Sequence, residues 1–167
     1  MFIAHAPSGY LLAKAIIRPG CSSAFAKAII LVGVVGAVIP DIDMVYFYLF
    51  DHRLHHHKYF THWPITWVAL LLMATVLMRW AATKKAAFLL AVFALAGMLH
   101  MLLDSVVGVI WWQAPWIKQP LKLFTIEAVY QPWWLNFILH WSFAVEMLIC
   151  LAAVYVCFKT PAQSDNA

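Results

Sequence analysis

The sequence predicts an all-α fold, a polytopic membrane helical bundle of about four to five apolar helices with a metal site at one membrane face. Two observations predict the bundle: 65% of the 167 residues are hydrophobic and only 11% are charged, and the mean hydropathy is +0.84. Histidines and acids at the ends of the apolar segments predict the metal site. The chain leaves no length for a soluble domain, so we expect one integral membrane domain over residues 1–158 and a polar tail over 159–167.

The first two apolar segments are predicted as helices over residues 3–17 and 24–39. Between them, "RPGCSS" at 18–23 has the proline, glycine and serines of a turn. Pro40 is expected to stop the second helix, because proline cannot continue the helical hydrogen-bond ladder. The polar, histidine-rich stretch "DHRLHHHKYFTH" follows at 51–62.

Three further helices are predicted over residues 63–78, 86–103 and 136–158, the last two separated by a long aromatic and proline-bearing connection. Five crossings would place seven cations on one side of the membrane and four on the other: Lys14, Arg18, Lys27, Arg79, Lys84, Lys85 and Lys159 against Arg53, Lys58, Lys118 and Lys122. The richer side is expected to be cytoplasmic. Because these cations flank apolar segments and form no basic stripe, no nucleic-acid binding is predicted despite the net charge of +4.

The polar residues of the predicted helix ends all fall on the other, extracytoplasmic side. They are His5, Asp41, Asp43, His57, His62, His100, Asp104, His140 and Glu146. Ionisable groups at membrane depth are rare and usually functional. Their convergence from five segments on one surface is the strongest functional signal in the sequence.

Imidazole and carboxylate ligands suit zinc first, with manganese or iron as alternatives. His100 and Asp104 are four residues apart on one helix face, so both can bind one ion. Asp41 and Asp43, held by the proline break, could bridge two ions, as carboxylates do in paired metal sites. The pattern therefore predicts one to three divalent ions.

Each of these residues also has a structural explanation. A lone His100 is more often a hydrogen-bonded core residue, and Asp41 and Asp43 could simply mark a helix end. His55 and His56 are interpreted as a solvated loop run. His140 and Glu146 lie about 120° apart on an ideal helix and need not bind the same ion.

Four motifs in order give the chain a family resemblance: "AHAPSG" at 4–9, "PDID" at 40–43, "HKYFTH" at 57–62 and "GMLHMLLD" at 97–104. They resemble the YdjM family of inner-membrane, metal-dependent hydrolases, with its early histidine, PD-x-D, HRG-x-THS and H-x3-D. The ligand order of that family is similar to that of zinc-dependent phospholipases C and single-strand nucleases. The resemblance covers residues 4 to about 115, and more loosely the closing span. It implies that the membrane domain over residues 1–158 is hydrolase-like and lies in a bacterial-type inner membrane.

The resemblance also implies roles for individual residues. It makes metal ligands of His5, Asp41 or Asp43, His62, His100 and Asp104, with His140 and Glu146 as later ones, and it matches His57 to the first histidine of HRG-x-THS. The chain departs from the pattern at Lys58, Tyr59 and Trp63, which replace arginine, glycine and serine, and at Ala144, which stands where the phospholipases carry an acid. Lysine offers a point charge in place of bidentate phosphate recognition.

The sequence therefore predicts a membrane-bound hydrolase that acts on a phosphoester or lipid-linked substrate with metal-activated water. Asp41, Asp43 and His57 are the predicted catalytic residues, and Lys58, Tyr59 and Trp63 are the predicted substrate-binding residues. The predicted partners are the lipid bilayer and a membrane lipid or lipid-linked phosphoester, with no obligate protein partner. The alternatives are a non-catalytic metal-binding or transport protein and a structural membrane subunit with a degenerate site.

Overall fold

The computed structural model describes residues 3–50, 56–117 and 119–159, and this part of the chain is helical apart from its turns and loops. Its one pairing of extended residues is an isolated bridge between Ile110 and Leu121. The predicted all-α class is confirmed. Residues 160–167, most of the predicted polar tail, and the predicted solvated loop residue His55 lie outside the described ranges.

The first two helices are α1, His5–Ile16, and α2, Ser23–Val38. Gly20 in the turn between them has a φ of 81°, a conformation that glycine adopts without steric cost. Ser22 caps α2, its hydroxyl accepting from the Phe25 amide at 3.4 Å. Both helices lie where the sequence predicts them.

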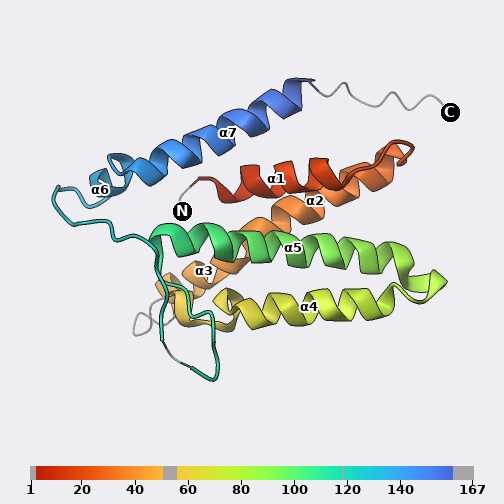
Figure 1. Ribbon diagram of the computed structural model, residues 1–167, viewed down its shortest axis with the longest axis horizontal. Helices are drawn as coiled ribbons and strands as arrows, with labels where there is room; N and C mark the ends of the chain where they lie inside the picture. Colours follow the sequence, from red (N-terminus) through yellow and green to blue (C-terminus); the bar gives the residue numbers. More distant parts are fainter. Residues whose placement is uncertain (1–2, 51–55, 118, 160–167) are drawn as a thin grey trace.

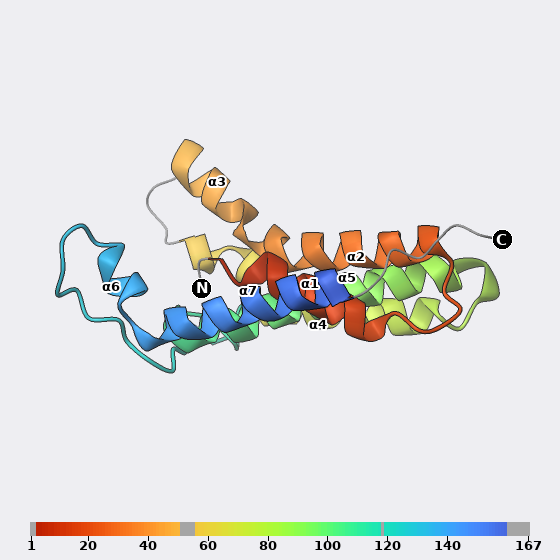
Figure 2. The ribbon, with the colours of Figure 1, turned by 90° about the horizontal axis from the view of Figure 1, so that it is seen from above.

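α2 ends just before Pro40, as the sequence predicts, but the chain stays helical beyond the proline. A 3₁₀ turn, η1 (Ile39–Asp41), follows α2, and a new helix, α3 (Ile42–Leu49), begins directly after it. Pro40 lies in the first residues of η1, where its missing N–H costs no helical hydrogen bond. The proline therefore redirects the helix, and α3 leaves the bundle at an angle to α2 (Figure 2).

The next elements are two 3₁₀ turns, η2 (His56–Lys58) and η3 (Phe60–His62), and then α4, Pro64–Leu77. A further 3₁₀ turn, η4 (Ala81–Thr83), leads into α5, Lys84–Val107, which is longer than the predicted helix at both ends. After the long connection come a short helix, α6 (Leu135–Ile138), and α7, Trp141–Lys159. The predicted last helix is thus divided just before Trp141.

Four of the longer helices lie side by side in the order α1, α2, α5, α4, and α7 packs on the outer side of α1 (Figure 1). Small residues allow this close packing: a Cβ at Gly36 would meet the Phe93 carbonyl oxygen at 2.5 Å, and one at Gly97 would overlap the Trp67 ring. Three segments are long and apolar enough to cross a membrane, Ser23–Leu49, Ala81–Val107 and Trp141–Lys159, and α4 is a shorter apolar helix. With 12 residues, α1 is about 18 Å long, shorter than the hydrocarbon core of a typical bilayer.

The bundle has two chemically different ends. The α1–α2 turn, the α4–α5 turn and the end of α7 lie together at one end (Figure 1). These turns and the helix ends beside them contain Lys14, Arg18, Lys27, Arg79, Lys84, Lys85 and Lys159. The start of α1, the end of α2, η3, the start of α4 and the end of α5 meet at the opposite end, where the predicted ligands are.

Candidate metal centre

Five of the predicted ligands converge at one end of the bundle with His57, which the sequence predicts as a catalytic residue. They come from five elements: His5 from α1, Asp41 from η1, His57 from η2, His62 from η3, and His100 and Asp104 from α5. Asp41 is half-buried and the other five are buried. Their ligand atoms form two groups within which the atoms lie within 4.8 Å of one another: Asp41, His57, His62 and Asp104, and His5, His100 and Asp104.

Asp104 belongs to both groups and uses both of its oxygens. Its Oδ1 is 3.0 Å from His5 Nε2. Its Oδ2 is 3.2 Å from His100 Nε2 and 3.4 Å from His57 Nε2, and 3.8 Å from His62 Nε2. The carboxylate is therefore common to the two groups of potential ligands.

Asp41 closes the centre on the α2 side. Its Oδ1 lies 3.6 Å from His62 Nε2 and 3.5 Å from His100 Nε2. Separations of this size exceed the 2.7–2.9 Å or so of charge-assisted hydrogen bonds. They match the roughly 3.3 Å between neighbouring ligands in tetrahedral zinc coordination. The spacing therefore fits ligands arranged around ions.

Hydrogen bonds at the Nδ1 atoms orient the imidazole rings of His100 and His57. The Nδ1 atoms of His100 and His57 lie 2.7 and 3.1 Å from the carbonyl oxygens of Ala37 and Val109. Because a carbonyl only accepts, these rings carry their proton on Nδ1 and present the Nε2 lone pair to the centre. Within the described residues, the fully buried Nε2 of His100 makes no hydrogen bond, although it faces two carboxylates. Such an atom fits a metal ligand.

Asp43 orients His62 and belongs to neither group. Its Oδ2 lies 2.5 Å from His62 Nδ1 and accepts a hydrogen bond from the Thr61 hydroxyl at 2.6 Å. Burial alone would lower the pKa of His62, but the nearby carboxylates of Asp41, Asp43 and Asp104 outweigh burial and raise it to about 9. The site is therefore built to hold positive charge, which a proton supplies when no metal does.

The segment that carries His57 and His62 is fixed to α4. The Trp67 indole donates to the Thr61 carbonyl at 2.9 Å, and the Thr66 hydroxyl donates to the Phe60 carbonyl at 2.8 Å. Gly97 lets the Trp67 ring lie against α5, where a side chain would collide with it. These contacts attach the short η3 segment to α4.

The other predicted site residues lie around the centre. The indole of Trp63 donates to the Lys58 carbonyl at 3.0 Å, and Lys58 Nζ lies 5.7 Å from the centre of the Trp111 ring. His140 Nδ1 lies 2.9 Å from the Ser142 hydroxyl oxygen, and Glu146 accepts from backbone amides at the start of α1. The structure brings neither His140 nor Glu146 into the two groups.

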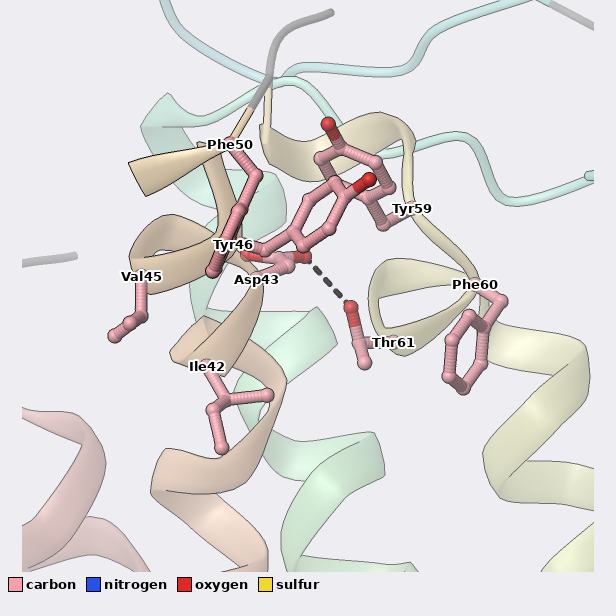
Figure 3. A pocket seen from close by; sticks show the side chains of 8 residues that line it. All are labelled: Ile42, Asp43, Val45, Tyr46, Phe50, Tyr59, Phe60 and Thr61. Atoms are coloured by element: carbon pink, nitrogen blue, oxygen red, sulfur yellow. Dashed lines mark hydrogen bonds between the residues drawn. The ribbon is translucent and has the colours of Figure 1, made fainter. Parts of the chain in front are cut away.

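A cavity of about 500 Å³ lies beside the centre, between α3 and the η2–η3 segment (Figure 3). Its walls are mainly aliphatic and aromatic, with Tyr59, the third of the predicted substrate-binding residues, on one side. The rings of Tyr46 and Tyr59 meet edge to face, 5.4 Å apart. Asp43 and Thr61 are among the lining residues, and Figure 3 shows the hydrogen bond between them. Asp43 thus connects the cavity to His62.

Sequence reasoning did not identify Thr61 as a partner of Asp43 or Asp104 as the shared carboxylate. The threonine of the HRG-x-THS pattern was a signal for the first. The shared position of Asp104 depends on how closely the other helix ends approach α5. The H-x3-D spacing gives no information about these approaches.

Comparison with protein families matches residues 1–164 of the chain to the family described as YdjM inner membrane protein. No curated protein and no solved structure matches the chain.

Proposed function

The chain belongs to the YdjM family of inner membrane proteins, and on that premise we propose that it is a membrane-bound metal-dependent hydrolase with a two-ion centre. The observation that carries the proposal is the position of Asp104, whose Oδ1 faces His5 of one group while its Oδ2 faces His57 and His62 of the other. Carboxylates shared by paired metal ions are a feature of enzymes that hydrolyse phosphoesters. When bound, such ions supply an activated water and stabilise the negative charge that develops on phosphoryl oxygens.

The two groups differ in their number of ligands. Asp41, His57, His62 and Asp104 offer four protein ligands, the number found in closed zinc sites. His5, His100 and Asp104 offer three, the number that leaves a position for water or substrate in catalytic zinc sites. We therefore assign the chemistry to the His5 group and a supporting role to the other. Zinc suits both donor sets best, with manganese or iron as alternatives.

The cavity supports a substrate with an apolar part. Its lining includes Ile42 and Val45, exposed apolar side chains of the candidate span Ser23–Leu49, as well as the buried Asp43. A hydrocarbon chain held there would place the attached polar group beside the centre. A membrane lipid or lipid-linked phosphoester is therefore the proposed substrate, and Tyr59 forms part of the wall for its chain.

The cations support an extracytoplasmic site. Seven of them belong to the segments at the end of the bundle opposite the centre, and cytoplasmic ends of membrane helices are enriched in lysine and arginine. A reporter fused to the C-terminus tests this orientation, because the end of α7 lies at the cation-rich end. Cytoplasmic reporter activity is expected.

The alternative function is metal binding or transport without hydrolysis. A conduit needs polar groups through the bilayer, and the buried polar side chains of the described residues gather toward the end of the bundle that holds the centre. Within α4, no ionisable residue lies between Pro64 and Leu77. This distribution favours a site at the membrane rim over a path through the membrane.

The test of the proposal is elemental analysis of the detergent-purified full chain, followed by hydrolysis assays. We expect two zinc ions per chain, and metal-dependent cleavage of bis(p-nitrophenyl) phosphate or of phospholipid in mixed micelles. Bound zinc without cleavage of either substrate would favour the non-catalytic alternative. A chain that binds no zinc, manganese or iron after reconstitution would refute the metal centre itself.

A further inference from the structure

Glu146 is a buried acid in α7, a helix that is otherwise largely exposed and packs mainly on α1. It lies within the candidate span Trp141–Lys159, and only 3% of its surface is exposed. A carboxylate in such surroundings is costly unless hydrogen bonds compensate its charge. Its bonding partners therefore indicate why the position carries an acid.

The partners are backbone amides that precede the first helix. Glu146 Oε2 accepts from the Ile3 amide at 2.7 Å and from the Ala4 amide at 3.3 Å. Ala4 is the N-cap residue of α1 and has no side-chain oxygen with which to cap it. Amides at a helix start need acceptors, and negative charge there is stabilised by the helix dipole. Glu146 thus supplies from another helix the cap that the local sequence lacks.

The residue after Ala4 is His5, a member of the three-ligand group. Its ring stacks on that of His100, with 3.7 Å between centroids, and its Nε2 is 3.0 Å from Asp104 Oδ1. Because His5 begins α1, the position of its ring depends on where the helix starts. Glu146 fixes that start from a distance of 2.7 Å.

We propose that Glu146 is a positioning residue for His5, holding the first turn of α1 so that the His5, His100 and Asp104 group can bind its ion. The inference rests on the proposed two-ion centre. The inference treats the two groups differently, because none of Asp41, His57, His62 and Asp104 lies on α1 or α7. Removing Glu146 should therefore empty one ion site and leave the other filled.

The experiment compares zinc content and zinc affinity of the full chain, purified in detergent, for the wild type and single variants. Glu146→Ala is expected to retain one of two ions, as is His5→Ala, and the double variant should lose no more than either alone. Glu146→Gln, whose amide oxygen still accepts from an N–H, should keep both ions. Ser142→Ala, a change at another buried residue of α7, is the matched control and should also keep both.

A second variant tests the contact without altering the buried acid. Ile3→Pro removes the 2.7 Å donor, because proline has no N–H. It should weaken zinc binding by the His5, His100 and Asp104 group about tenfold or more, the effect of losing one hydrogen bond to a charged group. Cobalt substitution gives an independent readout, since the visible spectrum of the variants should report one tetrahedral ion in place of two.

The outcomes separate this inference from the proposed function. A wild type with two ions and a folded Glu146→Ala variant that also holds two, with unchanged affinity, would overturn the positioning role alone. Equal loss of both ions from Glu146→Ala and Glu146→Gln would also overturn it, because a general structural role would then explain the result. A wild type without bound metal would remove the centre on which both proposals stand.

Discussion

The Oδ2 atom of Asp43 lies 2.5 Å from Nδ1 of His62, and this contact turns the opposite nitrogen of the ring toward Asp41 and Asp104. A carboxylate behind a ligating histidine fixes its orientation and raises its basicity. Asp43 therefore acts on the metal centre through His62.

Asp43→Ala should lower the zinc affinity of the four-ligand group by about 10–100-fold, the usual effect of losing such a carboxylate. A competition titration against a chelator measures the change. Thr61→Val is the matched control: it removes the hydroxyl that donates to Asp43 but keeps the Asp43–His62 contact, so its effect should be smaller. Equal affinities in wild type and Asp43→Ala would mean that His62 needs no such support.

Asp104 and His100 should differ in the number of ions lost on substitution. Asp104→Ala removes a ligand from both groups, so we expect no stoichiometric zinc, whereas His100→Ala should retain one ion held by Asp41, His57, His62 and Asp104. Elemental analysis of the two purified variants decides the point. If Asp104→Ala kept one full equivalent, the carboxylate would not be shared.

Zinc binding should strengthen with pH because the metal must displace a proton from His62. The pKa of His62 is about 9 in the fold against 6.5 for an unperturbed histidine. In the metal-free protein, its contacts with carboxylates stabilise the fold fully below about pH 6.5, and this stabilisation is lost as the pH rises through about 9. Affinity should accordingly rise about tenfold per pH unit between these values, for one proton released.

Chelator titrations at several pH values measure that slope. In His62→Ala, zinc binding should release one proton fewer, so the slope of log affinity against pH should fall by one. The affinity itself should also be lower. A wild-type affinity that stayed constant over this range would contradict the raised pKa of His62.

Gly97→Ala should destabilise the protein, since the added methyl group would overlap the Trp67 ring. Overpacking of this kind costs about 1–3 kcal/mol, which should lower the midpoint of thermal unfolding in detergent by several degrees. Leu95→Ala, at a 38% exposed position of the same helix, is the control and should change the midpoint little. A variant as stable as wild type would show that Trp67 can move aside freely.

Val45→Trp should reduce hydrolysis of long-chain phospholipid, because the indole would fill the cavity beside Asp43. Cleavage of the soluble bis(p-nitrophenyl) phosphate should be retained, since that substrate has no chain to accommodate. Val35→Trp, on the exposed side of α2, serves as the control for adding a large side chain to a lipid-facing surface. Parallel loss of both activities would argue against a chain-binding role for the cavity.

Most of the helices follow from the sequence, because long apolar runs define α2, α4, α5 and α7 whatever their neighbours are. α3 does not, because Pro40 has the same local effect whether the chain stops or turns there. The gathering of polar helix ends was predictable from topology alone. The sharing of Asp104 and the placement of Glu146 were not, since they depend on how the helices are rotated and how closely small residues such as Gly36 let them approach.

The order of the ligands along the chain sets the order in which the centre can assemble during biosynthesis. His5, Asp41, His57, His62 and His100 all leave the ribosome before Asp104. The carboxylate that joins the two groups therefore arrives last. Until α5 is inserted, the earlier ligands have no common partner, and maturation of the centre must await most of the nascent chain.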